Sequence, residues 1–267
     1  MASDVDLAGS VVVHERRDTY HIVRMSRPQK RNAMHREGRR ALLRAFERSA
    51  EESARVVILT GTDKSFCSGV DMVERAEDQR AGALAEPQSD WIELLTAIRQ
   101  HPAVFIAAVN GVAMGGGAAF VNVCDLAIAS HDASISSPEM GFGAFAHFSG
   151  PGAQFQALPK RVAWMLYTTD RIDGATAAAW GLVNECVSPD ELLPRAEALA
   201  SRIAAFDPIA LTETKRALES TPSAEVSWRE AFEYGQRVNE RIRNPPSTRV
   251  YELRGFEERG MKPDEEG

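Results

Sequence analysis

The sequence has few cysteines, and none of them is placed for a metal site. Cys67, Cys124 and Cys186 lie far apart along the 267 residues, without the close spacing of zinc ligands, and two of them stand in apolar runs. We interpret them as reduced core thiols of a cytoplasmic protein and expect no bound metal.

Long apolar runs and an excess of positive charge are also missing. No stretch approaches the ~18 consecutive apolar residues of a membrane span, and residues 1–10 are too acidic and polar for a signal peptide. The formal net charge of −7 argues against nucleic acid as the main partner. We therefore expect neither a membrane nor a nucleic acid as partner. The G-x-G-x-x-G fingerprint of dinucleotide sites and the Gly-Lys-Ser/Thr of P-loops are absent as well.

A glycine-rich turn lies at the centre of the sequence. Residues 103–109 are a short apolar run of strand length, and Asn110-Gly111 is a strong turn signal. Residues 115–117 are all glycine and come directly before a short apolar helix. The first turn of a helix has unpaired N–H groups and partial positive charge, which suits a phosphate, a carboxylate or a forming oxyanion. The alternative is a turn needed only for packing, since glycine is common in tight turns.

A second glycine turn has the same design. The apolar strand at 56–60 is followed by Gly61 and by residues 64–71, with a tight glycine at Gly69. Ligands often bind beyond the carboxyl ends of strands in α/β sheets. If the two turns are neighbours, they can direct two N–H groups at one point.

Glu139 is the candidate proton carrier. It follows Pro138 and comes before four phenylalanines, namely Phe142, Phe145, Phe148 and Phe155. Apolar surroundings raise the pKa of a carboxyl group and make it a usable acid–base near neutral pH. The alternative is a surface or helix-terminal glutamate, which is commoner. His147 in the same loop is the second candidate, although a packed or exposed histidine is the more frequent case.

The remaining pattern predicts strands and helices in alternation, with a helical last third. A helix is expected from about Asn32–Met34 to Glu52, with Leu42, Ala45, Phe46 and Ser49 on its core side and a solvated arginine-rich side. We expect a mobile loop at 76–89 and a helix at 90–100, with Trp91, Leu94, Leu95 and Ile98 at core spacing. Ser188–Glu191 reads as a capping box with proline at the first helical position. Further strands are expected at 11–14, 20–25, 126–129 and 133–137, and further helices at 208–219, 225–243 and 247–259.

Several motifs together resemble a known family. They stand in family order and comprise residues 27–34 (RPQKRNAM), 66–71 (FCSGVD), 107–117 (AAVNGVAMGGG), 124–129 (CDLAIA), 138–139 (PE) and 181–184 (GLVN). On these motifs the chain is identified as a member of the crotonase superfamily, the enoyl-CoA hydratases and isomerases. The resemblance covers about residues 10–260.

The resemblance implies an α/β fold, a crotonase-like spiral of β-β-α units. Residues 1–200 would form the spiral core, and residues 201–267 a C-terminal helical region that builds a homotrimer or a dimer of trimers. It implies an acyl-CoA substrate and no cofactor beyond the coenzyme A of that substrate.

The resemblance also implies the site residues. The thioester oxygen would bind in an oxyanion hole formed by the N–H groups of Ser68 and Gly116, with Glu139 as the acid–base. The substrate-binding residues implied are Lys30, Asn32, Cys67, Gly69, Val70, Asp71, Gly115 and Phe256.

One departure from the hydratase pattern divides the possible activities. Hydratases carry two glutamates that hold and split a water; the second matches Glu139, and the first falls on Ala119. Our first hypothesis is therefore an acyl-CoA isomerase or hydratase-like enzyme that uses Glu139 as its one base, most simply to move a double bond. His147 lies where some relatives place a second acid–base, so a carbon–carbon hydrolase or ring-opening enzyme is the second. A non-catalytic acyl-CoA binder is the third.

Overall fold

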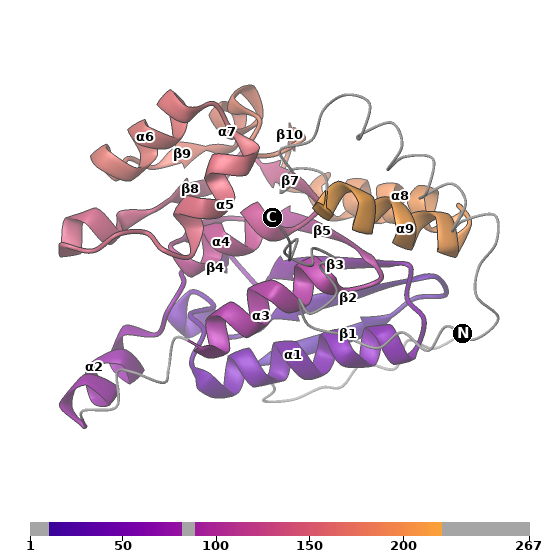
Figure 1. Ribbon diagram of the computed structural model, residues 1–267, viewed down its shortest axis with the longest axis horizontal. Helices are drawn as coiled ribbons and strands as arrows, with labels where there is room; N and C mark the ends of the chain where they lie inside the picture. The colour runs from indigo at the N-terminus through magenta and orange to yellow at the C-terminus, as the bar shows by residue number, and fades with distance from the viewer. Residues whose placement is uncertain (1–10, 82–88, 221–267) are drawn as a thin grey trace, which may run out of the picture.

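The computed structural model describes residues 11–81 and 89–220 and has an α/β fold with two sheets (Figure 1). The six-stranded sheet has the spatial order β1 (Val12–Arg16), β2 (Tyr20–Met25), β3 (Val56–Gly61), β5 (Val104–Val109), β7 (Leu126–Ser130) and β10 (Glu185–Val187). Its strands are parallel except for the antiparallel pair β1–β2. The four-stranded sheet has the order β4 (Ser65–Cys67), β6 (Val112–Met114), β8 (Ser134–Ser136) and β9 (Ile172–Asp173).

Each central strand of the large sheet leads directly into a strand of the small sheet. Thus β3 leads into β4, β5 into β6 and β7 into β8, and a helix follows each pair. This repeat is the expected spiral of β-β-α units. Because β4, β6 and β8 lie side by side in parallel, the loops after them open at the same edge.

Helices cover the sheets. The described ones are α1 (Arg36–Glu51), α2 (Met72–Arg80), α3 (Ser89–Gln100), α4 (Gly116–Val123), α5 (Ser149–Gln156), α6 (Pro159–Thr168), α7 (Gly174–Trp180), α8 (Leu192–Ala204) and α9 (Pro208–Ser220), with the 3-10 helices η1 (Pro28–Lys30) and η2 (Pro138–Phe142). In Figure 1, α1 and α3 run side by side, and α2 projects from the body below the η2 segment. No described helix is long and apolar enough to cross a membrane.

Strand residues alternate between two cores, one on each face of the large sheet. Val57 and Leu59 of β3 face the larger core, which includes α1, α3 and α4, whereas Val56 and Ile58 face the smaller core under α8. This follows from the two-residue period of side chains along a strand. Parallel strands covered on both faces are apolar throughout, as the runs at 56–60 and 103–109 predict.

Three sequence expectations are corrected by the structure. The first helix begins at Arg36 instead of Asn32–Met34, because Arg31 and Asn32 adopt left-handed backbone conformations (φ 50° and 56°) and His35 caps the helix. Part of the loop expected at 76–89 belongs to α2. The Ser188–Glu191 contact forms, but the regular helix starts only at Leu192.

The C-terminal region is described only in part. The helix expected at 208–219 is confirmed as α9, and the expected boundary at residue 200 falls inside α8. The helices expected at 225–243 and 247–259 lie outside the described residues, as does Phe256.

Candidate active site

Two loops meet where β4 and β6 end, and glycines allow the contact. We call residues 68–71 the β4 loop and residues 115–117 the β6 loop. Gly69 has φ +89°, and a Cβ atom on it would lie 3.1 Å from the amide nitrogen of Gly116. A Cβ atom on Gly117 would lie 1.8 Å from the carbonyl oxygen of Cys67. Only glycine fits at such distances, so the expectation of two neighbouring glycine turns is confirmed.

The N–H groups of these loops differ in availability. The N–H of Ser68 donates to the carbonyl oxygen of Arg31 at 3.0 Å, so the prediction that it lines an oxyanion hole is wrong. Among the hydrogen bonds of the described residues, the N–H groups of Val70 and Gly116 donate to no acceptor. Gly116 is the first residue of α4, where the helix dipole adds partial positive charge. The free pair is therefore Val70 and Gly116.

Glu139 lies against the β6 loop. Its Oε1 is 3.0 Å from the position of a Cβ atom on Gly115, next to Gly116. Its Oε2 is buried and has no hydrogen-bond partner in the described part of the chain. Burial raises the pKa of Glu139 above the usual glutamate range, although its own backbone N–H and the positive charges of His147 and Arg75 oppose the rise. A carboxyl group with a raised pKa is a stronger base than an ordinary glutamate and suits a proton carrier.

The phenylalanines expected around Glu139 mostly face solvent in this chain. Phe142, Phe145 and Phe155 are 74%, 57% and 77% exposed, so the desolvation of Glu139 does not come from burial among them. Phe148 is the exception, because it is partly buried and stacks on Trp91 with ring centroids 5.5 Å apart.

His147 is exposed at the edge of the site. Its Nδ1 lies 3.3 Å from the carbonyl oxygen of Phe145, and its ring packs on Phe148. It is close enough for its charge to act on the pKa of Glu139, but no hydrogen bond joins the two side chains in the described structure.

Two of the expected substrate-binding side chains are used inside the protein. The amide of Asn32 is fully buried and bonds the N–H of Arg27 and the carbonyl oxygens of Thr62 and Ser65. Asp71 pairs with Arg27 and accepts the N–H groups of Val73 and Glu74 at the start of α2. Burial works against the charge of Asp71, but these partners outweigh it and lower its pKa. Both side chains hold the loops, so the prediction that they bind substrate is wrong for the side chains.

The other expected binding residues divide between surface and interior. Lys30 is exposed. It lies next to the β4 loop, since Ser68 Oγ donates to its carbonyl oxygen at 3.3 Å. The thiol of Cys67 is buried, and burial raises its pKa to about 12. It therefore remains protonated and takes no part as a nucleophile.

Two residues near the site were not identified from the sequence. Arg39 was expected on the solvated side of its helix but is 1% exposed, with its guanidinium group 5.9 Å from the ring of Trp91. Trp91 was expected only as core, yet its ring lies directly against Gly116. The Arg39 partners Glu74, Asp90 and Trp91 come from other helices, and Trp91 meets Gly116 from a distant segment, so the local pattern carried no signal for these contacts.

Comparisons with known proteins show the family of the chain. Residues 15–261 match the family model "Enoyl-CoA hydratase/isomerase". A crotonyl-CoA hydratase of Syntrophomonas wolfei is 32% identical over 218 residues, which cover 77% of this chain and 80% of that protein. A crystal structure of enoyl-CoA hydratase of Mycobacterium smegmatis superposes with a TM-score of 0.80 at 28% identity, covering 89% of this chain and 93% of that one. A monofunctional enoyl CoA isomerase of M. smegmatis gives a TM-score of 0.71 at 28% identity, covering 83% and 98%. The chain therefore belongs to the enoyl-CoA hydratase/isomerase family, within the crotonase superfamily.

Proposed function

We propose that the protein moves a carbon–carbon double bond along the acyl chain of an acyl-CoA thioester. The thioester oxygen binds between the N–H groups of Val70 and Gly116, and Glu139 takes a proton from one carbon and returns it to another. The observation that carries this proposal is the Glu139 carboxyl group in contact distance of Gly115, beside the free N–H of Gly116.

The two N–H groups lower the main energy barrier of such a reaction, which is the formation of the enolate. Removing a proton beside a thioester places negative charge on its oxygen, and a preorganised donor is worth about 3 kcal/mol for that charge. The raised pKa of Glu139 makes the carboxylate a stronger base than a glutamate in water.

The side chain at position 119 favours isomerisation over water addition. Addition of water needs a second group to hold and activate the water, and Ala119, buried one turn into α4, has no acid–base group. One carboxyl group suffices for a proton shuttle between two carbons.

The test is turnover of a 3-enoyl-CoA and a 2-enoyl-CoA by the wild type and by Glu139→Gln. We expect the wild type to isomerise the first faster than it hydrates the second, and Glu139→Gln to lose at least about 100-fold in kcat. Glu77→Gln, on the exposed side of α2, is the matched control and keeps its rate. Undiminished turnover by Glu139→Gln contradicts the proposal, and no turnover of any thioester by the wild type favours a non-catalytic acyl-CoA binder.

A second candidate function is hydrolysis of a carbon–carbon bond or ring opening. It is favoured by the position of His147, whose charge reaches Glu139. Offering β-keto and cyclic ketoacyl thioesters tests it, with acid release as the readout. Release that disappears in His147→Gln, while 3-enoyl-CoA turnover stays intact, supports this second activity.

We further propose that the enzyme needs no cofactor beyond coenzyme A and works as a cytoplasmic homotrimer or dimer of trimers. A proton shuttle changes no oxidation state, so activity should survive dialysis against a chelator. The unpaired Cys67 and Cys124 thiols support a reducing compartment. Sedimentation equilibrium of the full chain tests the assembly, and a monomer contradicts it.

A further inference from the structure

Arg39 is an unusual residue for the inner face of α1. Its side chain is buried on the same face of the helix as Leu42 and Phe46. A charge in such a place is costly unless it is paired. Its Nη1 donates to the carbonyl oxygen of Met34 at 3.1 Å and lies 3.2 Å from Glu74 Oε2. Its Nη2 lies 3.7 Å from Asp90 Oδ2, so α1, α2 and α3 each contribute to this cluster.

One side of the cluster supports the β4 loop. Met34 forms a parallel bridge with Val70: its N–H donates to the carbonyl oxygen of Gly69 at 2.8 Å, and its carbonyl oxygen accepts the N–H of Asp71 at 3.3 Å. Arg39 donates to that same carbonyl oxygen. It therefore holds the segment on which the Val70 N–H is aligned.

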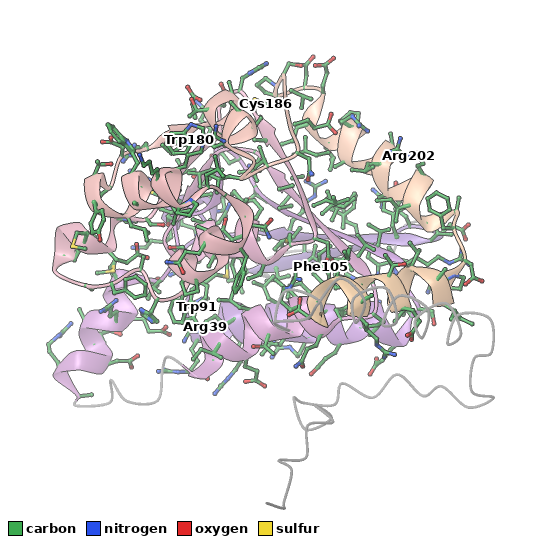
Figure 2. The ribbon with its side chains drawn as sticks, turned by 45° about the horizontal axis from the view of Figure 1, so that its top comes forward. Arg39, Trp91, Phe105, Trp180, Cys186 and Arg202 are labelled. Atoms are coloured by element: carbon green, nitrogen blue, oxygen red, sulfur yellow. The ribbon has the colours of Figure 1, made fainter. Side chains whose placement is uncertain are left out.

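The other side supports the β6 loop. The Trp91 ring lies under the guanidinium group of Arg39, and Figure 2 shows the two side chains next to each other. A Cβ atom on Gly116 would lie 2.4 Å from Trp91 Cη2 and 2.7 Å from Cζ3. The ring also packs on Phe120 and Phe148, at centroid distances of 5.4 and 5.5 Å. Its outer atoms thus support the residue that supplies the second N–H.

We propose that Arg39 and Trp91 are positioning residues that set the spacing between the Val70 and Gly116 N–H groups. The proposal rests on the proposed function. An oxyanion hole needs two donors at a fixed separation, and a misplacement of about 1 Å can cost about 100-fold in rate. Arg39 contacts the supports of both loops, Met34 and Trp91. Because Glu74 and Asp90 balance its charge, it acts through geometry.

The first test compares Arg39→Met with Arg44→Met, which removes an exposed ion pair with Glu37 from the same helix. We expect Arg39→Met to lower kcat 10- to 100-fold with KM changed less than threefold, and Arg44→Met to change neither. A bound 3-ketoacyl-CoA gives a second readout, because the ultraviolet absorbance of its enolate reports the pKa of enolisation. That pKa should rise by at least one unit in Arg39→Met.

The enolisation readout separates this proposal from the proposed function, because it needs binding but no turnover. If the wild type fails to isomerise 3-enoyl-CoA yet lowers the pKa of the bound ligand, and Arg39→Met abolishes the effect, the positioning role stands and the isomerase assignment fails. If Arg39→Met lowers only thermal stability and leaves both readouts unchanged, the positioning role is wrong.

A double substitution tests the Trp91 half even if Arg39→Met does not fold. Gly116→Ala places its Cβ against the outer ring atoms of Trp91, which phenylalanine lacks. We expect Gly116→Ala to abolish enolisation and Trp91→Phe with Gly116→Ala to recover it at least tenfold over the single variant. Gly117→Ala, which collides with the backbone of Cys67, is the control that Trp91→Phe does not rescue. Equal loss in the single and double Gly116 variants contradicts the proposal.

Discussion

At the scale of residues, unpaired buried polar atoms mark the site. In the described part of the chain these atoms are Arg39 Nε, Glu52 Oε2, Trp91 Nε1, Ser136 Oγ and Glu139 Oε2. All but Glu52 belong to the two loops or to the residues that support them, since the Ser136 carbonyl oxygen accepts the N–H of Gly115. Buried polar groups are normally satisfied, so a cluster of exceptions is typical of a functional region.

Asn32 and Lys30 are near neighbours with opposite expected roles. Asn32→Ala removes the partner of the Thr62 carbonyl oxygen and of the Arg27 N–H and places alanine at φ 56°. We therefore expect a loss of about 2–4 kcal/mol in the free energy of unfolding. Lys30→Ala should leave stability unchanged and raise the KM for an acyl-CoA about fivefold, because its exposed ammonium group suits the coenzyme phosphates. Urea unfolding and initial rates measure the two effects. A normal stability for Asn32→Ala contradicts its structural role.

At the scale of elements, the contact between α4 and β4 determines whether the loops converge. Gly117 lies one residue into α4, and Cys67 ends β4. Gly117→Ala puts a methyl group 1.8 Å from a backbone carbonyl oxygen, which cannot move aside without shifting the strand. We expect a loss of at least about 3 kcal/mol in stability, or no folded protein, by urea unfolding.

The matched control for that substitution is Gly141→Ala in η2. A Cβ atom there meets nothing within 4 Å, so its stability should stay within about 0.5 kcal/mol of the wild type. Equal stability of the two variants would show that α4 and β4 are not in close contact.

Element type was predicted better than element ends. The apolar run at 103–109 specifies a buried strand, and the spacing of Trp91, Leu94 and Ile98 specifies a helix, because both signals are local. The start of α1 depends on left-handed turns at Arg31 and Asn32, which the buried Asn32 amide stabilises through Thr62 and Ser65. Similarly, α2 depends on its cap at Asp71 and on Arg36 of α1, which bonds Glu74 and Asp78. Such distant partners leave no local sequence pattern.

At the scale of the whole molecule, buried neutral histidines make the fold sensitive to acid. Nδ1 of His101 accepts the N–H of Ala103 and Nε2 donates to Phe46, so the ring must be neutral, and burial lowers its pKa to about 3. Burial and the neighbouring His14 lower the pKa of His21 to about 4. Below pH ~6.5 the unfolded chain takes up these protons and the folded chain does not. The free energy of unfolding therefore decreases as the pH is lowered.

We therefore expect the free energy of unfolding to fall between pH 6.5 and about 4, by up to about 1.4 kcal/mol per pH unit for each such group. Urea unfolding at several pH values measures the slope. His101→Gln should reduce the slope by the contribution of one group, up to about 1.4 kcal/mol per pH unit. A flat profile for the wild type would mean that these histidines are protonated in the folded state.

The sequence by itself determined the strands, the two glycine turns, the family and the candidate base at Glu139, because these depend on residue type and on near neighbours. Only the tertiary structure decided which N–H groups are free and where charge is buried. The N–H of Ser68 donates to Arg31. The side chains of Asn32 and Asp71 bond groups within the protein, and Arg39 is buried in contact with Met34 and Trp91. Whether a polar group is available depends on partners that the fold brings from distant segments, and no local pattern records them.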